Sequence, residues 1–528
     1  MSLLALLNAC RKQPAPEPAP PPPPARPREV MLEAWLPEPQ ALWPRLRALS
    51  GSLESVLPRA PELAVAGFLG VSALNANSFD LGSPVVLSWL AGDAPGLVLG
   101  VHLQSGAELV AKLTTGSTPT HRAERRGPLQ LLFSNPSPSQ FAFAVEGDTL
   151  LVGPQPAVER VGDYVARGLA RSAPTQGPIG AFVPGDSLKR LLVPALFAAL
   201  QVGRAELGAA LEREQATRGR PADLAEPAVL LDWFDAGLRY GLSLLSSARE
   251  ARAELNLAEP LNELSLRLLP ESQGAAQELA ASSAAADAAP LESLPAASAL
   301  AVLVRRTSGS AAGDLLQPLL APRMSASDAK GLERGLADLD AGRGGWLSVA
   351  LQPDLGVVFR GQVNDAARLR SALPELLPLL TRKPLSELFR GALPTLTRRP
   401  SEKLPDATLE RATLTLSRTS RFELGALIGS ERFVAGFAKA DAASPLTATL
   451  AAEAGAGLGS DPKFGPLLGQ IRDAAFVAVA DLTRLGLSRG EPSAALELDC
   501  GPRQAALGCS LRASDAALRA LVLRRVVP

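Results

Sequence analysis

The chain contains LVLGVHLQSGAELVAKL at residues 97–113 and, aligned with it without a gap, VVFRGQVNDAARLRSAL at residues 357–373. In both segments alternating apolar residues predict a strand, a short polar stretch predicts a turn, and apolar residues at helical spacing predict an amphipathic helix. The shared order of elements indicates that the chain contains two related parts.

Further matches flank this pair and keep the same order in both parts of the chain. VEGDTLLVG (145–153) parallels IGSERFVAG (428–436), GAFVPGDSLKRL (180–191) parallels AAFVAVADLTRL (474–485), and the segment beginning LSLR at 264 parallels the one beginning CSLR at 509. Each match alone is weak, because sequence rich in Leu and Ala aligns easily. Their collinearity predicts a diverged duplication.

The predicted fold class is α+β, with two diverged copies of an antiparallel sheet on which helices pack. We expect the copies at residues 48–290 and 291–528, related by a pseudo-two-fold axis, since equivalent apolar surfaces are self-complementary. The first copy carries a helical insertion at about residues 187–240. This insertion is interpreted as a helical pair covering a sheet face, and a functional addition is the alternative.

The N-terminus predicts a lipid anchor. Residues 1–9 are typical of a partial lipoprotein signal peptide, and Leu7-Asn8-Ala9-Cys10 resembles a lipobox whose cysteine is acylated. Residues 10–47 would then comprise the lipidated Cys10 and a proline-rich tether, in which residues 13–27 adopt polyproline II conformation. The alternative is a short, frayed apolar terminus. Arg11, in place of the Asp that retains enteric lipoproteins in the inner membrane, favours the outer membrane.

The other two cysteines lie near the C-terminus in LELDCGPRQAALGCSLR. This segment predicts two strands around a turn at Gly501–Gln504, with Cys500 and Cys509 facing each other. A disulfide there suits an oxidising periplasm, and two reduced, half-buried thiols are the alternative.

Composition and motifs argue against several classes of function. Lys+Arg and Asp+Glu are both 53, so a basic surface for nucleic acid is not expected. We expect no metal and no cofactor, because neither His102 nor His121 has a Cys, His or acidic residue at ligand spacing. The chain has no G-x-S-x-G motif, so we predict no catalytic residues, although a triad assembled in space stays open.

Asp186 and Asp481 are the acidic pair that the repeat relates. Each follows an apolar strand and precedes Leu-x-Arg-Leu, which predicts that each caps the N-terminus of a helix. A catalytic dyad is the alternative, although neither residue has the D-T/S-G context of aspartic proteases.

Two short motifs carry a family resemblance. Residues 294–302 fit the pattern LPA-x-x-ALAV, and residues 475–482 fit AFV-x-x-x-DL. In these motifs the chain resembles exported bacterial proteins, often lipoproteins, of high-GC, myxobacterium-like genomes. The resemblance implies a location in the cell envelope and no known activity.

The sequence therefore favours a non-enzymatic protein of the envelope, anchored by an N-terminal lipid to the periplasmic face of the outer membrane of a Gram-negative bacterium. We expect it to act as a scaffold or binding protein for another envelope component. A periplasmic carrier of an apolar ligand or lipid is the second hypothesis, and a hydrolase with spatially assembled residues is the third.

Overall fold

The structure is a computed structural model of the 528-residue chain. It describes residues 22–50, 54–69, 72–115, 119–134, 142–218, 235, 239, 241–258, 261–284, 286–306, 317, 320–353, 356–383, 385–388, 394–416, 421–439, 449, 455, 457–485, 495–503 and 506–518. Cys10, the predicted signal segment and most of the proline-rich tract lie outside the described residues. The predicted tether does not extend to residue 47, because residues 30–36 form a strand of the sheet and residues 39–49 form a helix.

The chain divides into two compact units. The first comprises Met1–Val30, Asn77–Asp80 and Val85–Ala173, and the second comprises Met31–Ala76, Leu81–Pro84 and Pro174–Pro528. These units group residues by contact, whereas the predicted copies group them by sequence similarity. The division into copies at residue 290 therefore stays a prediction.

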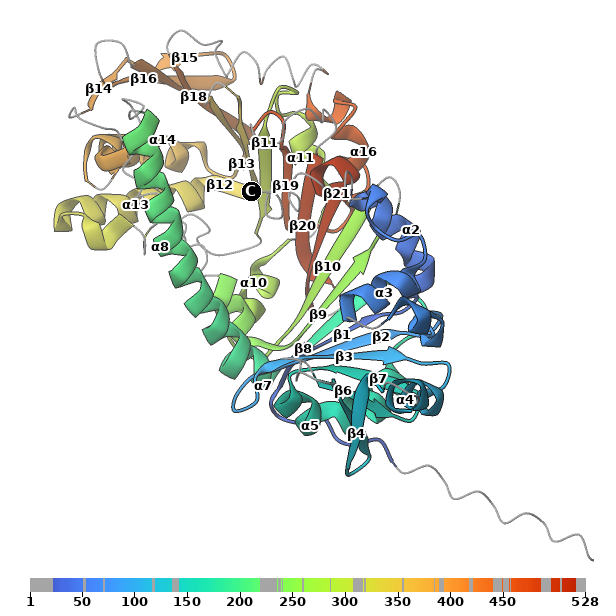
Figure 1. The fold of residues 1–528 in the computed structure, drawn as a ribbon. Helices are drawn as coiled ribbons and strands as arrows, with labels where there is room; N and C mark the ends of the chain where they lie inside the picture. The colour runs from blue at the N-terminus through green and yellow to red at the C-terminus, as the bar shows by residue number, and fades with distance from the viewer. Residues whose placement is uncertain are drawn as a thin grey trace, which may run out of the picture. The chain divides into compact units, whose positions relative to one another are not determined.

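The first unit is an antiparallel sheet in the order β4-β5-β6-β7-β3-β2 (Figure 1). The tight hairpin between β6 and β7 pairs Glu146 with Thr149 and turns through Gly147, whose φ of 55° favours glycine. The elements are β2 (Val85–Leu90), β3 (Gly96–His102), α4 (Gly106–Thr114), β4 (His121–Arg126), β5 (Leu129–Ser134), β6 (Ala142–Glu146), β7 (Thr149–Gly153), α5 (Gln155–Tyr164) and α6 (Ala170–Ser172).

The second unit is built on a longer antiparallel sheet. Its strands follow the order β1-β8-β9-β10-β21-β20-β19-β11-β12-β13-β18-β17-β16, and β14 and β15 both pair with β16. The pairing of β10 with β21 joins the strands β1-β8-β9-β10 to the rest of this sheet (Figure 1).

The strands of this sheet are β1 (Val30–Leu36), β8 (Ile179–Pro184), β9 (Ala248–Asn256), β10 (Leu261–Pro270), β11 (Leu300–Arg305), β12 (Arg343–Leu351), β13 (Val357–Val363), β14 (Thr395–Arg398), β15 (Glu402–Lys403), β16 (Ala407–Thr415), β17 (Arg421–Gly429), β18 (Arg432–Lys439), β19 (Phe476–Asp481), β20 (Ala495–Arg503) and β21 (Ala506–Ser514). The helices are α2 (Pro39–Leu49), α3 (Pro61–Leu69), α7 (Gly185–Ser187), α8 (Val193–Arg218), α10 (Ala275–Ser282), α11 (Ala289–Glu292), α13 (Ala326–Gly342), α14 (Ala366–Leu376) and α16 (Gly465–Leu468).

The two segments that align in sequence fold as the pattern predicts. The first forms strand β3 and helix α4, and the second forms strand β13 and helix α14. Ser105 caps α4 by accepting a hydrogen bond from the Glu108 N–H, and Asp365 caps α14 by accepting from the N–H groups of Ala367 and Arg368. A short polar residue between strand and helix therefore ends the strand and begins the helix in both places.

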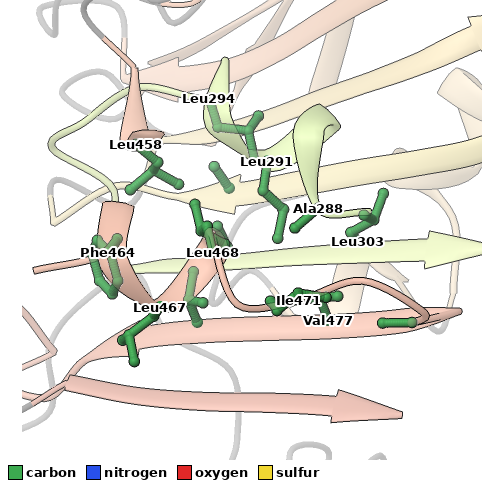
Figure 2. Close-up of a cluster of buried hydrophobic side chains, with 14 of the residues drawn as sticks. Ala288, Leu291, Leu294, Leu303, Leu458, Phe464, Leu467, Leu468, Ile471 and Val477 are labelled. Atoms are coloured by element: carbon green, nitrogen blue, oxygen red, sulfur yellow. The ribbon is translucent and has the colours of Figure 1, made fainter. Parts of the chain in front are cut away.

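One large core of the second unit lies on one face of strands β11 and β19. Short helices α11 and α16 cover this face, and Figure 2 shows their side chains meeting those of the strands. Phe464 is 1% exposed and Leu291 is fully buried. Burial of such side chains contributes roughly 1.5–3 kcal/mol each relative to exposure. The core residues drawn and labelled are Ala288, Leu291, Leu294, Leu303, Leu458, Phe464, Leu467, Leu468, Ile471 and Val477.

The region of the predicted helical insertion contains α8. Arg239 stacks over the ring of Phe197 at 5.4 Å, and Arg204 lies 3.9 Å from Asp235, so α8 contacts the segment that follows it. Most of that segment lies outside the described residues. Among the helices that the structure describes, none has both the length and the apolar character needed to cross a membrane.

The α+β class with antiparallel pairing is confirmed. One detail differs from the sequence prediction: Gly501–Arg503 continue strand β20, pairing with Gly508, Leu507 and Ala506, and do not form the turn. Gly501 serves close packing instead, since a Cβ there would lie 2.7 Å from the carbonyl oxygen of Asp473.

Candidate functional site: an apolar cavity beneath helix α10

The register of the long sheet sorts its side chains onto two faces. Phe476 pairs with Cys500, Cys500 pairs with Cys509, and Cys509 pairs with Leu266. Paired residues in an antiparallel sheet point to the same face, so these four side chains lie on one face. Their neighbours along each strand, Val477 among them, point to the opposite face, where the core shown in Figure 2 lies.

A cavity of about 400 Å³ lies on the face that carries Phe476. It is partly open to solvent, and its lining is predominantly apolar. The sheet contributes Val304, Phe476, Leu507 and the Cys500–Cys509 pair, and the residues from outside the sheet are Leu244, Ala275 and Leu279. Helix α10 supplies the last two. The cavity therefore exists because α10 packs beside this face without filling it.

The rim of the cavity is polar and carries both signs of charge. Glu278, Ser283, Arg305 and Arg306 lie there. Arg306 donates from Nε and Nη2 to the Ser282 hydroxyl at 3.3 and 3.0 Å. Arg305 pairs with Trp346, which packs against the core on the opposite face of the sheet, so the Arg305 side chain points to that face. There it donates to the backbone oxygen of Asp287 at 2.8 Å, and burial lowers the pKa of its guanidinium from the usual value. An apolar interior with the Arg306 cation at its edge suits a ligand with an apolar body and a polar end.

Cys500 and Cys509 are joined by a disulfide in the wall of the cavity, with their Cα atoms 4.0 Å apart. The bond links β20 to β21 at directly opposed positions. It holds the hairpin together at the cavity and leaves no thiol on these two residues.

The opposite face of the same hairpin holds buried charges. Glu497 is fully buried and Asp499 is 1% exposed, and Arg512 Nη1 lies 2.8 and 2.9 Å from their respective carboxylates. Burial raises the pKa of Glu497 to about 7, with the nearby Asp499 adding to the rise and Arg512 opposing it. Burial also raises the pKa of Asp499, against the attraction of Arg503 and Arg512. These groups lie on the face opposite the cavity and do not line it.

The histidines belong to the first unit, and neither lines this cavity. His102 ends strand β3, and His121 begins strand β4. His121 Nδ1 lies 3.1 Å from the Thr120 hydroxyl, and its Nε2 lies 3.3 Å from the Ser134 hydroxyl. Burial lowers the pKa of His121. In a catalytic triad a carboxylate would occupy the position that Thr120 holds, so His121 and Ser134 do not form one.

The two related aspartates differ. Asp481 Oδ1 accepts hydrogen bonds from the N–H groups of Thr483 and Arg484 at 2.9 and 3.0 Å, as a capping residue does. Residues 482–485, however, form a turn and not the predicted helix. Although burial acts to raise the pKa of Asp481, the Lys463 ammonium at 2.7 Å and the two backbone N–H groups lower it overall. Asp186 instead lies inside α7, which begins after Pro184 and has no side-chain cap. Here the capping prediction is wrong, because the proline ends the strand two residues earlier.

Among the residues that the structure describes, no group of three His, Cys, Asp or Glu side chains could hold a metal ion. The residues of the cavity, apart from the cysteines, were not identified from the sequence. The alternation in Leu300–Arg305 and Phe476–Asp481 does indicate two faces, but both faces are apolar there, so the pattern could not say which face stays open.

Comparisons with known proteins do not assign the chain to a family. No family model matches it, and no curated protein matches it significantly. Among solved structures, crystal forms I, III and IV of TP0453 align with 46% of this chain and 76–78% of their own, at 6–8% identity and a TM-score of 0.22.

Proposed function

We propose that this protein is a lipid-anchored component of the bacterial cell envelope that binds an apolar ligand and does not act as an enzyme. The apolar cavity beneath α10 carries the proposal. Its volume of about 400 Å³ falls within the range of roughly 300–1,000 Å³ that is usual for small-molecule sites. Its walls offer hydrocarbon and disulfide sulfur, which favour burial of an alkyl chain or a lipid tail.

The absence of a reaction is part of the proposal. Within the described lining, the ionisable side chains are those of the rim, and each arginine there already donates hydrogen bonds within the protein. We propose that Arg306 orients the polar end of the ligand and that no side chain of the lining transfers a proton.

The ligand can be tested by native mass spectrometry on the full chain, purified gently from a bacterial envelope host. We expect excess mass that organic solvent extracts as lipid. A bare mass, together with no displacement of a fluorescent fatty acid, would contradict the carrier and leave a scaffold that binds another envelope protein.

The anchor is a separate part of the proposal and needs its own measurement. We expect Cys10 to carry a diacylglyceryl group and to be the N-terminal residue when the chain is produced with its native upstream sequence in a Gram-negative host. Intact mass measurement checks this, with Cys10→Ser as the unacylated control. An unmodified Cys10 would remove the anchor without affecting the cavity.

We also propose that the chain arose by duplication and that a local pseudo-two-fold axis passes between β10 and β21. Two registers support this. Leu99 pairs with Val152 in the first unit, Phe359 pairs with Ala435 in the second, and the sequence alignment equates these pairs. The strand order β1-β8-β9-β10 also parallels β11-β19-β20-β21.

A further inference from the structure

Helix α3 and the residues around it expose large apolar side chains. Val56 is 78% exposed, Leu63 is 42% exposed, Phe68 is 84% exposed and Leu74 is 92% exposed. Scattered apolar side chains are ordinary on protein surfaces, but four at this level within nineteen residues of chain form a concentration that calls for a partner.

Helix α3 presents exposed positions along its length. Leu63, Gly67 and Phe68 are all exposed, and Leu63 and Gly67, four residues apart, are neighbours on the helix surface. Among the residues of α3 whose side chains the structure describes, the small Ala66 is the buried one, while the larger Leu63 and Phe68 are exposed. This is the reverse of the arrangement that stabilises a surface helix of a globular domain.

The charge of the segment is equally unusual. From Arg59 to Ser78 its charged residues are Arg59 and Glu62, both near its start. Along the chain, therefore, no charged residue lies within five positions of Phe68 or Leu74. Burying them in an apolar phase would cost little desolvation of ionised groups.

The partner with the best fit is a lipid bilayer. Phe68 and Leu74 project from the surface at more than four-fifths exposure, and a protein partner would need pockets shaped to receive them. Acyl chains receive projecting side chains without such shape complementarity. In addition, residues 11–21 separate Cys10 from the described part of the chain, and a polyproline II tether of that length would span roughly 35 Å. An anchored chain would therefore be held near a membrane.

We propose that α3 and Leu74 insert into the interfacial region of a lipid bilayer, as a second membrane contact in addition to the anchor at Cys10. This goes beyond ligand binding in the cavity beneath α10. It applies to the unlipidated chain as well, so it can be tested without the anchor.

The test uses the full chain carrying Cys10→Ser and large unilamellar vesicles made of equal parts of phosphatidylcholine and phosphatidylglycerol. We expect the chain to sediment with the vesicles. The double variant Phe68→Ser, Leu74→Ser should weaken this partitioning at least about tenfold, because two large apolar side chains are lost from the contact. The matched control is Val202→Ser on α8, which is 60% exposed and should leave partitioning unchanged.

A fluorescent dye on α3 gives a second test, which reports whether the helix enters an apolar environment and does not depend on how strongly the chain partitions to vesicles. In the Cys10→Ser chain the remaining cysteines form the disulfide, so Gly67→Cys provides the single free thiol for an environment-sensitive dye. A Cβ at residue 67 meets nothing within 4 Å, so the substitution fits. We expect the emission of a dye attached to Gly67→Cys to shift to the blue when vesicles are added. The emission of the same dye on Val202→Cys should not shift.

Three outcomes would overturn the proposal. The first is a Cys10→Ser chain that does not sediment with vesicles, which would leave any anchor at Cys10 as the sole membrane contact. The second is unchanged partitioning of the double variant. The third is an oligomer, measured by light scattering, that the double variant dissociates while vesicle binding persists, which would assign the exposed side chains to a second copy of the chain.

Discussion

Ser265 of β10 lies directly opposite Ser510 of β21, and the sequence repeat equates the same two residues. On either side of this pair, Leu264 faces Leu511 and Leu266 faces Cys509. Two equivalent edge strands thus satisfy each other's backbone hydrogen bonds, so neither presents an open edge to solvent at this point. The cavity lies beside this junction, because β21 supplies Leu507 and Cys509 to its wall.

Filling the cavity should abolish ligand binding. Ala275, in the first turn of α10, lines the cavity, and Ala275→Trp would place an indole in the space. We expect the affinity for a fluorescent fatty acid to fall at least about tenfold, because the alkyl chain and the indole compete for one volume. Ala281→Trp on the exposed side of the same helix is the control. Equal loss in both variants would indicate damage to the helix and not occlusion.

Removing the disulfide should destabilise the second unit. The bond closes a loop with a sequence separation of 9, for which the loss of loop entropy in the unfolded chain is worth about 2.5 kcal/mol. We expect the variant with Cys500→Ser and Cys509→Ser to lose that amount of its free energy of unfolding, which lowers the urea concentration at the unfolding midpoint. Adding reductant should shift the parent protein but not the double variant. A parent chain insensitive to reductant would contradict a structural role for the bond.

The buried carboxyl of Glu497 should make stability fall as pH rises. Its pKa is raised from 4.5 to about 7 in the folded state, mainly by burial. The unfolded chain therefore releases a proton that the folded chain retains, so stability is lost as pH increases through this interval. The full effect is about 3 kcal/mol.

Glu497→Gln tests this assignment, because glutamine keeps the shape and removes the titration. Urea unfolding between about pH 5 and pH 8 should give a flatter dependence for this variant than for the parent. Glu402→Gln, on the exposed strand β15, should keep the parent slope. Asp481 acts in a different interval: its pKa is lowered, so its stabilisation is lost only as pH falls below the usual 3.8. Parallel slopes for Glu497→Gln and the parent would show that Glu497 is ionised in the fold.

The core beneath α11 and α16 should be sensitive to truncation. Phe464→Ala leaves a cavity at a site 1% exposed, and we expect a loss of about 3–5 kcal/mol in the free energy of unfolding. Phe68→Ala, at a site 84% exposed, should change stability by less than about 0.5 kcal/mol. Chemical denaturation of both variants compares them directly. A large loss at Phe68 would mean that its ring packs against the protein.

Local patterns sufficed for several elements. The strand, turn and helix of residues 97–113 and 357–373 follow from spacing and from the caps Ser105 and Asp365, which act within a few residues. The failures involve distant contacts. In LELDC, for example, the alternation is typical of a solvated polar face, yet Glu497 and Asp499 are buried, because Arg512 from the next strand donates hydrogen bonds to both carboxyl groups.

The sequence by itself determined the α+β class, the antiparallel hairpins and the strand and helix of residues 97–113 and 357–373, because each depends on periodicity and order along the chain. Only the tertiary structure decided which apolar face of β11 and β19 is filled by α11 and α16 and which is left open beneath α10. Both faces carry similar side chains, so the choice depends on where helices distant in sequence come to pack.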